Sequence, residues 1–111
     1  MANTNKTLKT MPFEIKNALI GFGANLKIAR NRRGLSARQV AEKIGIDQRT
    51  ILDAEKGKPT TAVSTYMGLL WAYDMLGDMG AVANPLKDAE GIRLAAARKK
   101  KTIKSELDND F

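Results

Sequence analysis

The sequence predicts an all-α fold of about five helices, and three observations support this class. Apolar residues recur three or four positions apart along most of the chain, which is the period of a helix with one buried face. No segment alternates apolar and polar residues between turn pairs, as a β-strand would. Serine, aspartate and glycine stand where short helices would begin and end. With 111 residues, the chain is long enough for one domain with a core.

The first predicted helix follows a polar N-terminus. Residues 1–11 are rich in threonine and asparagine, and we expect them to be flexible. Pro12 suits the first turn of a helix, and the pattern predicts helix from there to Arg33. Gly21 and Gly23 lie inside this stretch, where each glycine costs about 1 kcal/mol relative to alanine. The sequence leaves open whether the stretch forms one helix or two.

Two short helices are predicted on either side of Gly45. The first begins after Ser36, whose hydroxyl can cap the first turn while Gln39 completes a capping box. Gly45 ends it, because the residue after a helix commonly needs positive φ. The second begins after Asp47 and ends at Gly57. This spacing is typical of a helix-turn-helix, whose second helix can lie in a DNA major groove, but also of an ordinary αα-hairpin.

Residues 60–77 predict a further helix with two apolar stripes. The stripe expected to face the core consists of Tyr66, Leu69, Leu70, Tyr73 and Leu76. The second stripe consists of Met67, Trp71 and Met75. A helix that is apolar on two sides is either central to a core or has a partner on its second face. For the second stripe, the sequence leaves core and dimer interface open.

The composition favours a polyanionic partner and argues against most enzymes. The net charge is +7 and the isoelectric point about 9.9, which favours a partner such as nucleic acid or an acidic membrane surface. The chain has no cysteine and no histidine, which excludes disulfides, Cys or His metal sites and histidine base catalysis. We therefore expect no enzyme activity and no cofactor. No apolar run approaches the roughly 20 residues of a membrane span, and no signal peptide is evident, so we expect a cytoplasmic protein.

One long stretch of the chain carries a known motif, "NLKIARNRRGLSARQVAEKIGIDQRTILDAEKGKP". On these residues, the region from Phe22 to Gly77 resembles an Xre-type helix-turn-helix domain of the lambdoid phage repressor kind. The segment "GLLWAYDMLGDMGAVANPLKDAEGIRLAAARKKK" is similar to the C-terminal part of HipB-like antitoxins. There, a Trp-containing helix precedes an Asp/Asn-Pro pair, an Asp-x-x-Gly segment and a basic end.

The resemblance implies a lambda-repressor-like, DNA-binding antitoxin that neutralises a HipA-like serine/threonine kinase and represses its own operon. Residues 12–92 would form the DNA-binding and dimerisation domain, and residues 93–111 a charged tail. We also expect a homodimer on an inverted repeat of operator DNA, because one short helix makes limited contact. The expected dimer interface is the second stripe of Met67, Trp71 and Met75. A free-standing Xre-type repressor and a protein-interaction module remain open as alternatives.

Carried over onto this chain, the resemblance places the base-reading residues on the second short helix, at Gln48, Arg49 and Asp53. Gln48 can pair with adenine and Arg49 with guanine, each worth about 1 to 3 kcal/mol of discrimination. Asp53 can accept from cytosine, but we expect it to hold Arg49 instead.

The resemblance also implies backbone contacts and one ion pair. The expected DNA backbone residues are Ser36, Arg38, Thr50, Arg32, Arg33, Lys56 and Lys58. Ala37 stands where the family usually has a glutamine that contacts phosphate, and the neighbouring Arg38 could substitute for it. The family pairs an arginine with a glutamate, here Arg30 with Glu55, which would fix the packing angle between two helices.

The C-terminal segment separates its charges. Residues 93–104 carry six basic and no acidic groups, and residues 105–111 carry three acids and no base. Blocks of like charge are often disordered interaction tails. The sequence predicts such a tail, which either binds a partner or serves solubility alone.

Overall fold

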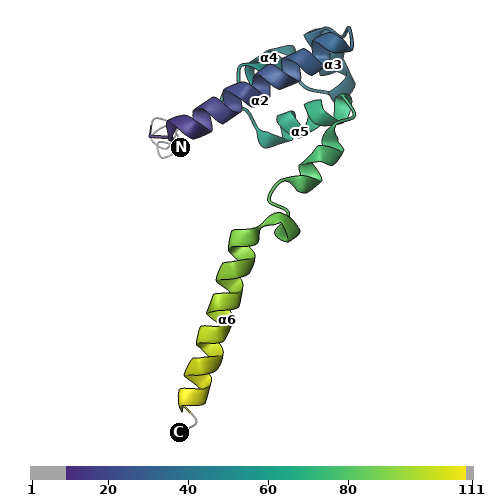
Figure 1. Cartoon of the computed structure of the whole chain (residues 1–111). Helices are drawn as coiled ribbons and strands as arrows, with labels where there is room; N and C mark the ends of the chain where they lie inside the picture. The colour runs from purple at the N-terminus through teal and green to yellow at the C-terminus, as the bar shows by residue number, and fades with distance from the viewer. Residues whose placement is uncertain (1–9, 110–111) are drawn as a thin grey trace. The chain divides into compact units, whose positions relative to one another are not determined.

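The computed structural model describes residues 10–109, and these contain helices and no strand (Figure 1), so the all-α class is confirmed for them. The expectation for the N-terminus lies almost wholly outside the described residues. The chain divides into one unit that ends at Leu76 and another that begins at Gly77. The first unit contains α2 (Phe13–Arg32), α3 (Ala37–Ile44), α4 (Gln48–Glu55) and α5 (Val63–Ala72). Next come the 3-10 helices η1 (Leu76–Ala81) and η2 (Pro85–Lys87), and then α6 (Ala89–Asn109).

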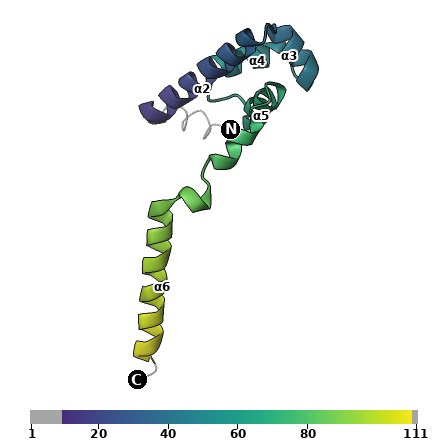
Figure 2. The same cartoon turned by 45° about the vertical axis from the view of Figure 1, so that its right-hand side comes forward.

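The stretch with two glycines forms one continuous helix, α2. Gly21 is exposed, and a Cβ there would meet nothing within 4 Å. Gly23 is buried, and its Cβ would lie 2.5 Å from the carbonyl oxygen of Ala54 and 2.7 Å from that of Glu55. Glycine at position 23 therefore allows α2 to approach the C-terminal end of α4, and α4 lies beside α2 in both ribbon views (Figure 1, Figure 2).

The helix ends predicted around Gly45 are confirmed. Ser36 Oγ accepts from the Gln39 amide at 3.1 Å, and Gln39 Oε1 accepts from the Ser36 amide at 2.8 Å. Gly45 has φ of 73°, the left-handed conformation that ends α3. Asp47 Oδ1 accepts from the Arg49 amide at 3.5 Å, at the start of α4. Local sequence signals thus fix the bend between α3 and α4.

The core of the first unit joins side chains from all four of its helices. The largest fully buried side chains are those of Leu26, Val40, Ile51, Leu69 and Tyr73. The ring of Phe22 on α2 stacks on that of Tyr66 on α5, with centroids 5.2 Å apart. Of the expected core stripe, Leu76 is the exception, because it is 40% exposed. The prediction was wrong there because α5 ends at Ala72, so the helical period does not extend to residue 76.

The second unit is helical over most of the segment for which the charge pattern predicted a disordered tail, so that prediction was wrong. Helix α6 runs through residue 92, where the sequence placed a boundary, and continues across the basic run. Alanine, leucine, arginine and lysine, which are good helix formers, make up all of residues 93–101. Asp88 Oδ1 accepts from the Gly91 amide at 3.0 Å, and Asn84 Oδ1 accepts from the Leu86 amide at 3.0 Å. Asn84 of the Asn-Pro pair therefore caps the short η2, and Asp88 of the Asp-x-x-Gly segment caps the start of the long α6.

Candidate nucleic-acid interface

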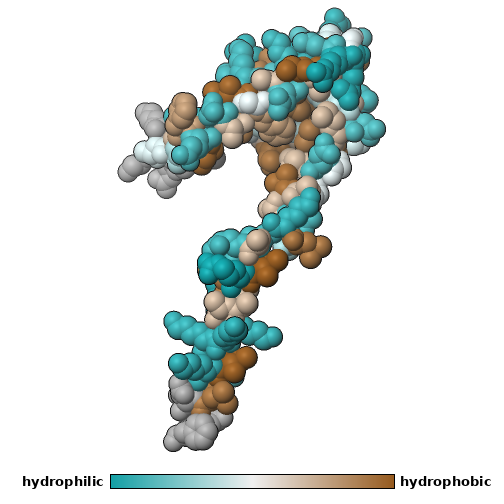
Figure 3. All heavy atoms as spheres, viewed as in Figure 1, coloured by the Kyte–Doolittle hydropathy of each residue, from teal (hydrophilic) through white to brown (hydrophobic). Residues whose placement is uncertain are grey.

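Helix α4 exposes its first turn and buries the opposite side. Ile51 and Ala54 are fully buried in the core, whereas Gln48 and Arg49 are exposed at the N-terminal end. Hydrophilic side chains also gather over the neighbouring α3 (Figure 3). A helix held in this way presents its first turn to an approaching surface, as the second helix of a helix-turn-helix does.

Asp53 brings together two cations at the exposed side of α4. Its Oδ1 lies 3.1 Å from Lys58 Nζ and 3.5 Å from Arg49 Nε. The Lys58 ammonium is the main cause that lowers the pKa of the Asp53 carboxyl, and the charges of Arg49 and Lys56 add to it. The side chain of Arg49 remains 72% exposed. Arg49 is therefore oriented by Asp53 and still free to approach a partner.

The ion pair expected between α2 and α4 is present and shielded from solvent. Arg30 Nε donates to Glu55 Oε2 at 2.7 Å, and Arg30 Nη2 donates to Glu55 Oε1 at 2.9 Å. Arg30 Nη1 donates to the Leu35 carbonyl at 3.0 Å. The two side chains are only 11% and 4% exposed. This bidentate contact joins the end of α4, the end of α2 and the loop between α2 and α3.

The loop after α4 lies against α2. Gly57 has φ of 71°, and a Cβ there would lie 2.6 Å from the Cα of Ile20, so only glycine fits this close approach. The contact forms a shallow recess lined by Lys16, Ile20, Lys56, Gly57, Lys58 and Pro59. Sequence reasoning proposed the two loop lysines and missed Lys16. No local signal identifies Lys16, because it lies about forty positions earlier in the chain.

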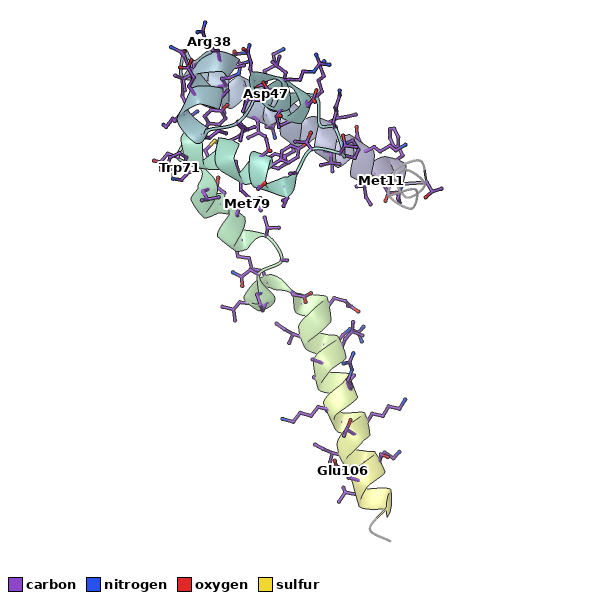
Figure 4. All side chains as sticks on the ribbon, turned by 180° about the vertical axis from the view of Figure 1, so that it is seen from behind. Met11, Arg38, Asp47, Trp71, Met79 and Glu106 are labelled. Carbon is purple, nitrogen blue, oxygen red and sulfur yellow. The ribbon has the colours of Figure 1, made fainter. Side chains whose placement is uncertain are left out.

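Other expected backbone residues lie at the start of α3 and on α4. The hydroxyl of Ser36 caps α3, and the exposed Arg38 lies 3.4 Å from Glu42 in an exposed ion pair. In Figure 4, Arg38 projects away from the unit. Thr50 is half-buried on α4.

Arg32 and Arg33 are placed differently from the other basic residues. Arg33 Nη1 donates to the Ala29 carbonyl at 3.0 Å, and Arg33 Nη2 donates to the Tyr73 carbonyl at 2.9 Å. Its guanidinium also lies 5.7 Å from the centroid of the Tyr73 ring. Both arginines line a recess near the end of α5, together with Ile28 and other residues. The guanidinium of Arg33 thus joins α2 to the C-terminal end of α5.

The second apolar stripe of α5 lies at the surface. Trp71 is 57% exposed, and Met67 and Met75 are half-buried. Figure 4 shows Trp71 projecting from the unit. Lys43 Nζ lies 5.7 Å from the centroid of the indole ring and donates to the Ala72 carbonyl at 3.4 Å. The sequence left open whether this stripe lies in the core or at a dimer interface. Because it is exposed, Trp71 is not part of the core of this unit.

Two further properties of the described residues concern the kind of site. None of their helices is both long enough and apolar enough to cross a membrane. They contain no group of three or more acidic residues arranged to hold a metal ion.

Comparison with known proteins gives one family match. Residues 26–69 match the model of a helix-turn-helix family, over the C-terminal end of α2, all of α3 and α4, and most of α5. No curated protein and no solved structure matches the chain. The family suggests a DNA-binding transcription regulator.

Proposed function

We propose that this chain, in which residues 26–69 form a helix-turn-helix domain, is a sequence-specific transcriptional repressor. The observation that carries the proposal is the exposed first turn of α4. Gln48 and Arg49 point to solvent there, while Ile51 and the Arg30–Glu55 pair hold the same helix to the core. A rigidly held helix with free amide and guanidinium groups suits direct readout of bases in a major groove.

The proposed roles at α4 follow from the chemistry of its side chains. Gln48 makes a bidentate contact to adenine N6 and N7, and Arg49 makes one to guanine O6 and N7. Asp53 orients Arg49 through the 3.5 Å contact and shares its charge with Lys58. Because the carboxylate would repel phosphate, Asp53 acts through its two cations and not by touching the DNA backbone.

The proposed backbone contacts surround this helix. They are made by Ser36, Arg38, Thr50, Lys56 and Lys58, with Lys16 added because it lines the same recess as the two loop lysines. Such contacts fix the register of the protein on DNA and carry no base code. Arg33 is left out, because its guanidinium donates to two carbonyls and lies over Tyr73. Arg32 is kept as a proposed backbone contact, although it lines the recess near the end of α5 and not the recess beside the loop after α4.

Selection of binding sites from random duplexes tests the proposal, followed by titration of two arginine variants. Arg49→Ala should cost about 1 to 3 kcal/mol on the selected site and much less on a site altered at the base pair it reads. Arg38→Ala is the matched control, since a phosphate contact should weaken both duplexes equally. Equal losses for Arg49→Ala on both duplexes would contradict its role as a base reader, and no enriched sequence would contradict sequence-specific binding.

We further propose a homodimer that uses the stripe around Trp71 and reads an inverted repeat. The half-sites would lie about 34 to 36 Å apart, one turn of DNA. The exposed indole supports this proposal, because large aromatic side chains are enriched at subunit interfaces. Trp71→Ala should weaken dimerisation in sedimentation experiments and DNA binding together. Val63→Ala, at another exposed position of α5, should change neither, and a monomer at concentrations that saturate the operator would contradict the dimer.

The finer proposal is that the repressor is the antitoxin of a HipA-like kinase, acts in the cytoplasm and represses its own operon. Its support is the resemblance of the segment from Gly68 to Lys101 to HipB-like antitoxins. Co-expression with the product of the neighbouring reading frame tests it. A stable complex and loss of kinase toxicity would support the antitoxin, whereas operator binding without a kinase neighbour would favour a free-standing repressor. Complex formation without any DNA binding would favour an interaction module.

A further inference from the structure

Helix α6 carries a dense set of cations that the helix-turn-helix does not use. These are Arg93, Arg98, Lys99, Lys100, Lys101 and Lys104, all of them exposed. Among the described residues, Arg93 has an ion pair with Glu90, and no ion pair joins the other five to an acid. In Figure 3, hydrophilic side chains project from the middle of this helix.

Five of the six cations lie over one half of the helix circumference. Since an α-helix turns about 100° per residue, Arg93, Lys100 and Lys104 follow one another along one line of its surface. Arg98 and Lys101 continue the same half. We call these five residues the basic face. The apolar side consists of Ile92, Ala96, Ile103 and Leu107 and lies between Lys99 and the line of Arg93, Lys100 and Lys104, whereas the exposed Leu94 lies within the basic half.

Repulsion between the cations of the basic face destabilises α6 itself. Lys100 and Lys104 are four residues apart, and Arg98 and Lys101 are three apart, so like charges are neighbours on the surface. Each such pair destabilises an isolated helix. A polyanion that lay along the face would remove this repulsion and gain from counterion release at the same time.

We propose that α6 is a second nucleic-acid-binding surface, which contacts backbone phosphates of double-stranded DNA without reading bases. This inference rests on the proposed function only in taking DNA as the polyanion. A second α6 is disfavoured as the occupant, because two basic runs would repel one another. An anionic bilayer is disfavoured because the apolar side has three large residues, with the small Ala96 between Ile92 and Ile103, and α6 contains no aromatic residue.

The test compares two variants with the same change of net charge. Lys100→Gln/Lys104→Gln removes two cations from the basic face, whereas Lys99→Gln/Lys87→Gln removes one beside the apolar side and one from η2. The full chain is titrated with the selected duplex and with a duplex that lacks the selected site, over a range of salt concentrations. Each phosphate contact contributes about 0.9 to the slope of log Kobs against log salt. The first variant should reduce the slope by roughly 1 to 2 per chain on both duplexes, and the second should leave it nearly unchanged.

Three outcomes would overturn the proposal. Equal slope losses in the two variants would mean that net charge alone acts, and an unchanged slope in both would remove α6 from DNA binding. The third is loss of binding to phosphatidylserine vesicles in the first variant with its DNA slope unchanged, which would assign the face to a membrane. Failure of the proposed function looks different, because no duplex would then be preferred while the slope could still depend on α6.

Discussion

The two glycines of α2 should respond in opposite directions to the same substitution. Gly21→Ala places a methyl group in open space on an exposed helix, so the gain in helix propensity should raise the free energy of unfolding by about 0.5 to 1 kcal/mol. Gly23→Ala makes the same gain but places Cβ 2.5 Å from the Ala54 carbonyl oxygen and 2.7 Å from that of Glu55. Both obstacles are backbone atoms, which cannot rotate away as a side chain would.

Overpacking of this kind costs about 1 to 3 kcal/mol, and here it should exceed the propensity gain. We therefore expect Gly23→Ala to be the less stable variant by at least about 1 kcal/mol, which corresponds to about 4 to 8 °C in melting temperature for a domain of this size. Thermal and urea denaturation followed by circular dichroism at the helical minimum measure both variants against the natural chain. Titration with the selected duplex adds a second readout, since under the proposed function a displaced α4 should bind DNA less tightly.

Two results would refute this reasoning. If Gly23→Ala were as stable as Gly21→Ala, then α2 would not approach the end of α4 as closely as the structure has it. If both variants lost stability equally, the helix would be bent at these glycines in solution, and neither position would have the conformation of a continuous α2.

Two other predictions concern stability. Glu55→Ala leaves the nearly buried Arg30 guanidinium unpaired and should lower the free energy of unfolding by about 3 kcal/mol. Glu42→Ala removes one partner of an exposed pair and should change it by less than about 0.5 kcal/mol. Similar losses for the two variants in urea denaturation would contradict the burial of the Arg30–Glu55 pair. Burial, helped by the charge of Glu55, raises the pKa of Tyr73 to about 12. Because a tyrosine in the unfolded chain has a pKa of about 10, the neutral Tyr73 stabilises the fold fully below about pH 10. This stabilisation is lost as the pH rises from about 10 to about 12. Tyr73→Phe should remove that alkaline loss of stability and cost nothing at neutral pH, because the Tyr73 hydroxyl has no hydrogen-bond partner among the described residues. Tyr66→Phe should lower the free energy of unfolding by about 1 kcal/mol, because the Tyr66 hydroxyl donates to the Lys58 carbonyl. Denaturation at pH 7 and above pH 10 checks both, and an unchanged alkaline loss in Tyr73→Phe would contradict the assignment.

The sequence by itself determined the elements whose causes are local. Ser36 and Gln39 form a capping box, and Gly45 adopts positive φ, because each depends on residues within one turn of a helix. The helical class and the buried positions of Tyr66, Leu69 and Leu70 follow from the period of apolar residues in the same way. Gln48 and Arg49 are likewise exposed because they lie on the polar side of such a periodic pattern.

The tertiary structure decided whatever depends on residues far apart in the chain. Whether Gly23 breaks a helix or allows close packing depends on the carbonyls of Ala54 and Glu55, about thirty positions later. Arg33 donates to the carbonyl of Tyr73, forty positions later, and Lys16 lines a recess together with the loop after α4. A charge or a glycine has the same local signature in either role, because side-chain partners are set by packing between helices. Local pattern therefore determined which side chains face outward and which pair within one helix, as Arg49 does with Asp53, and packing between helices determined the partners that lie far apart in the chain.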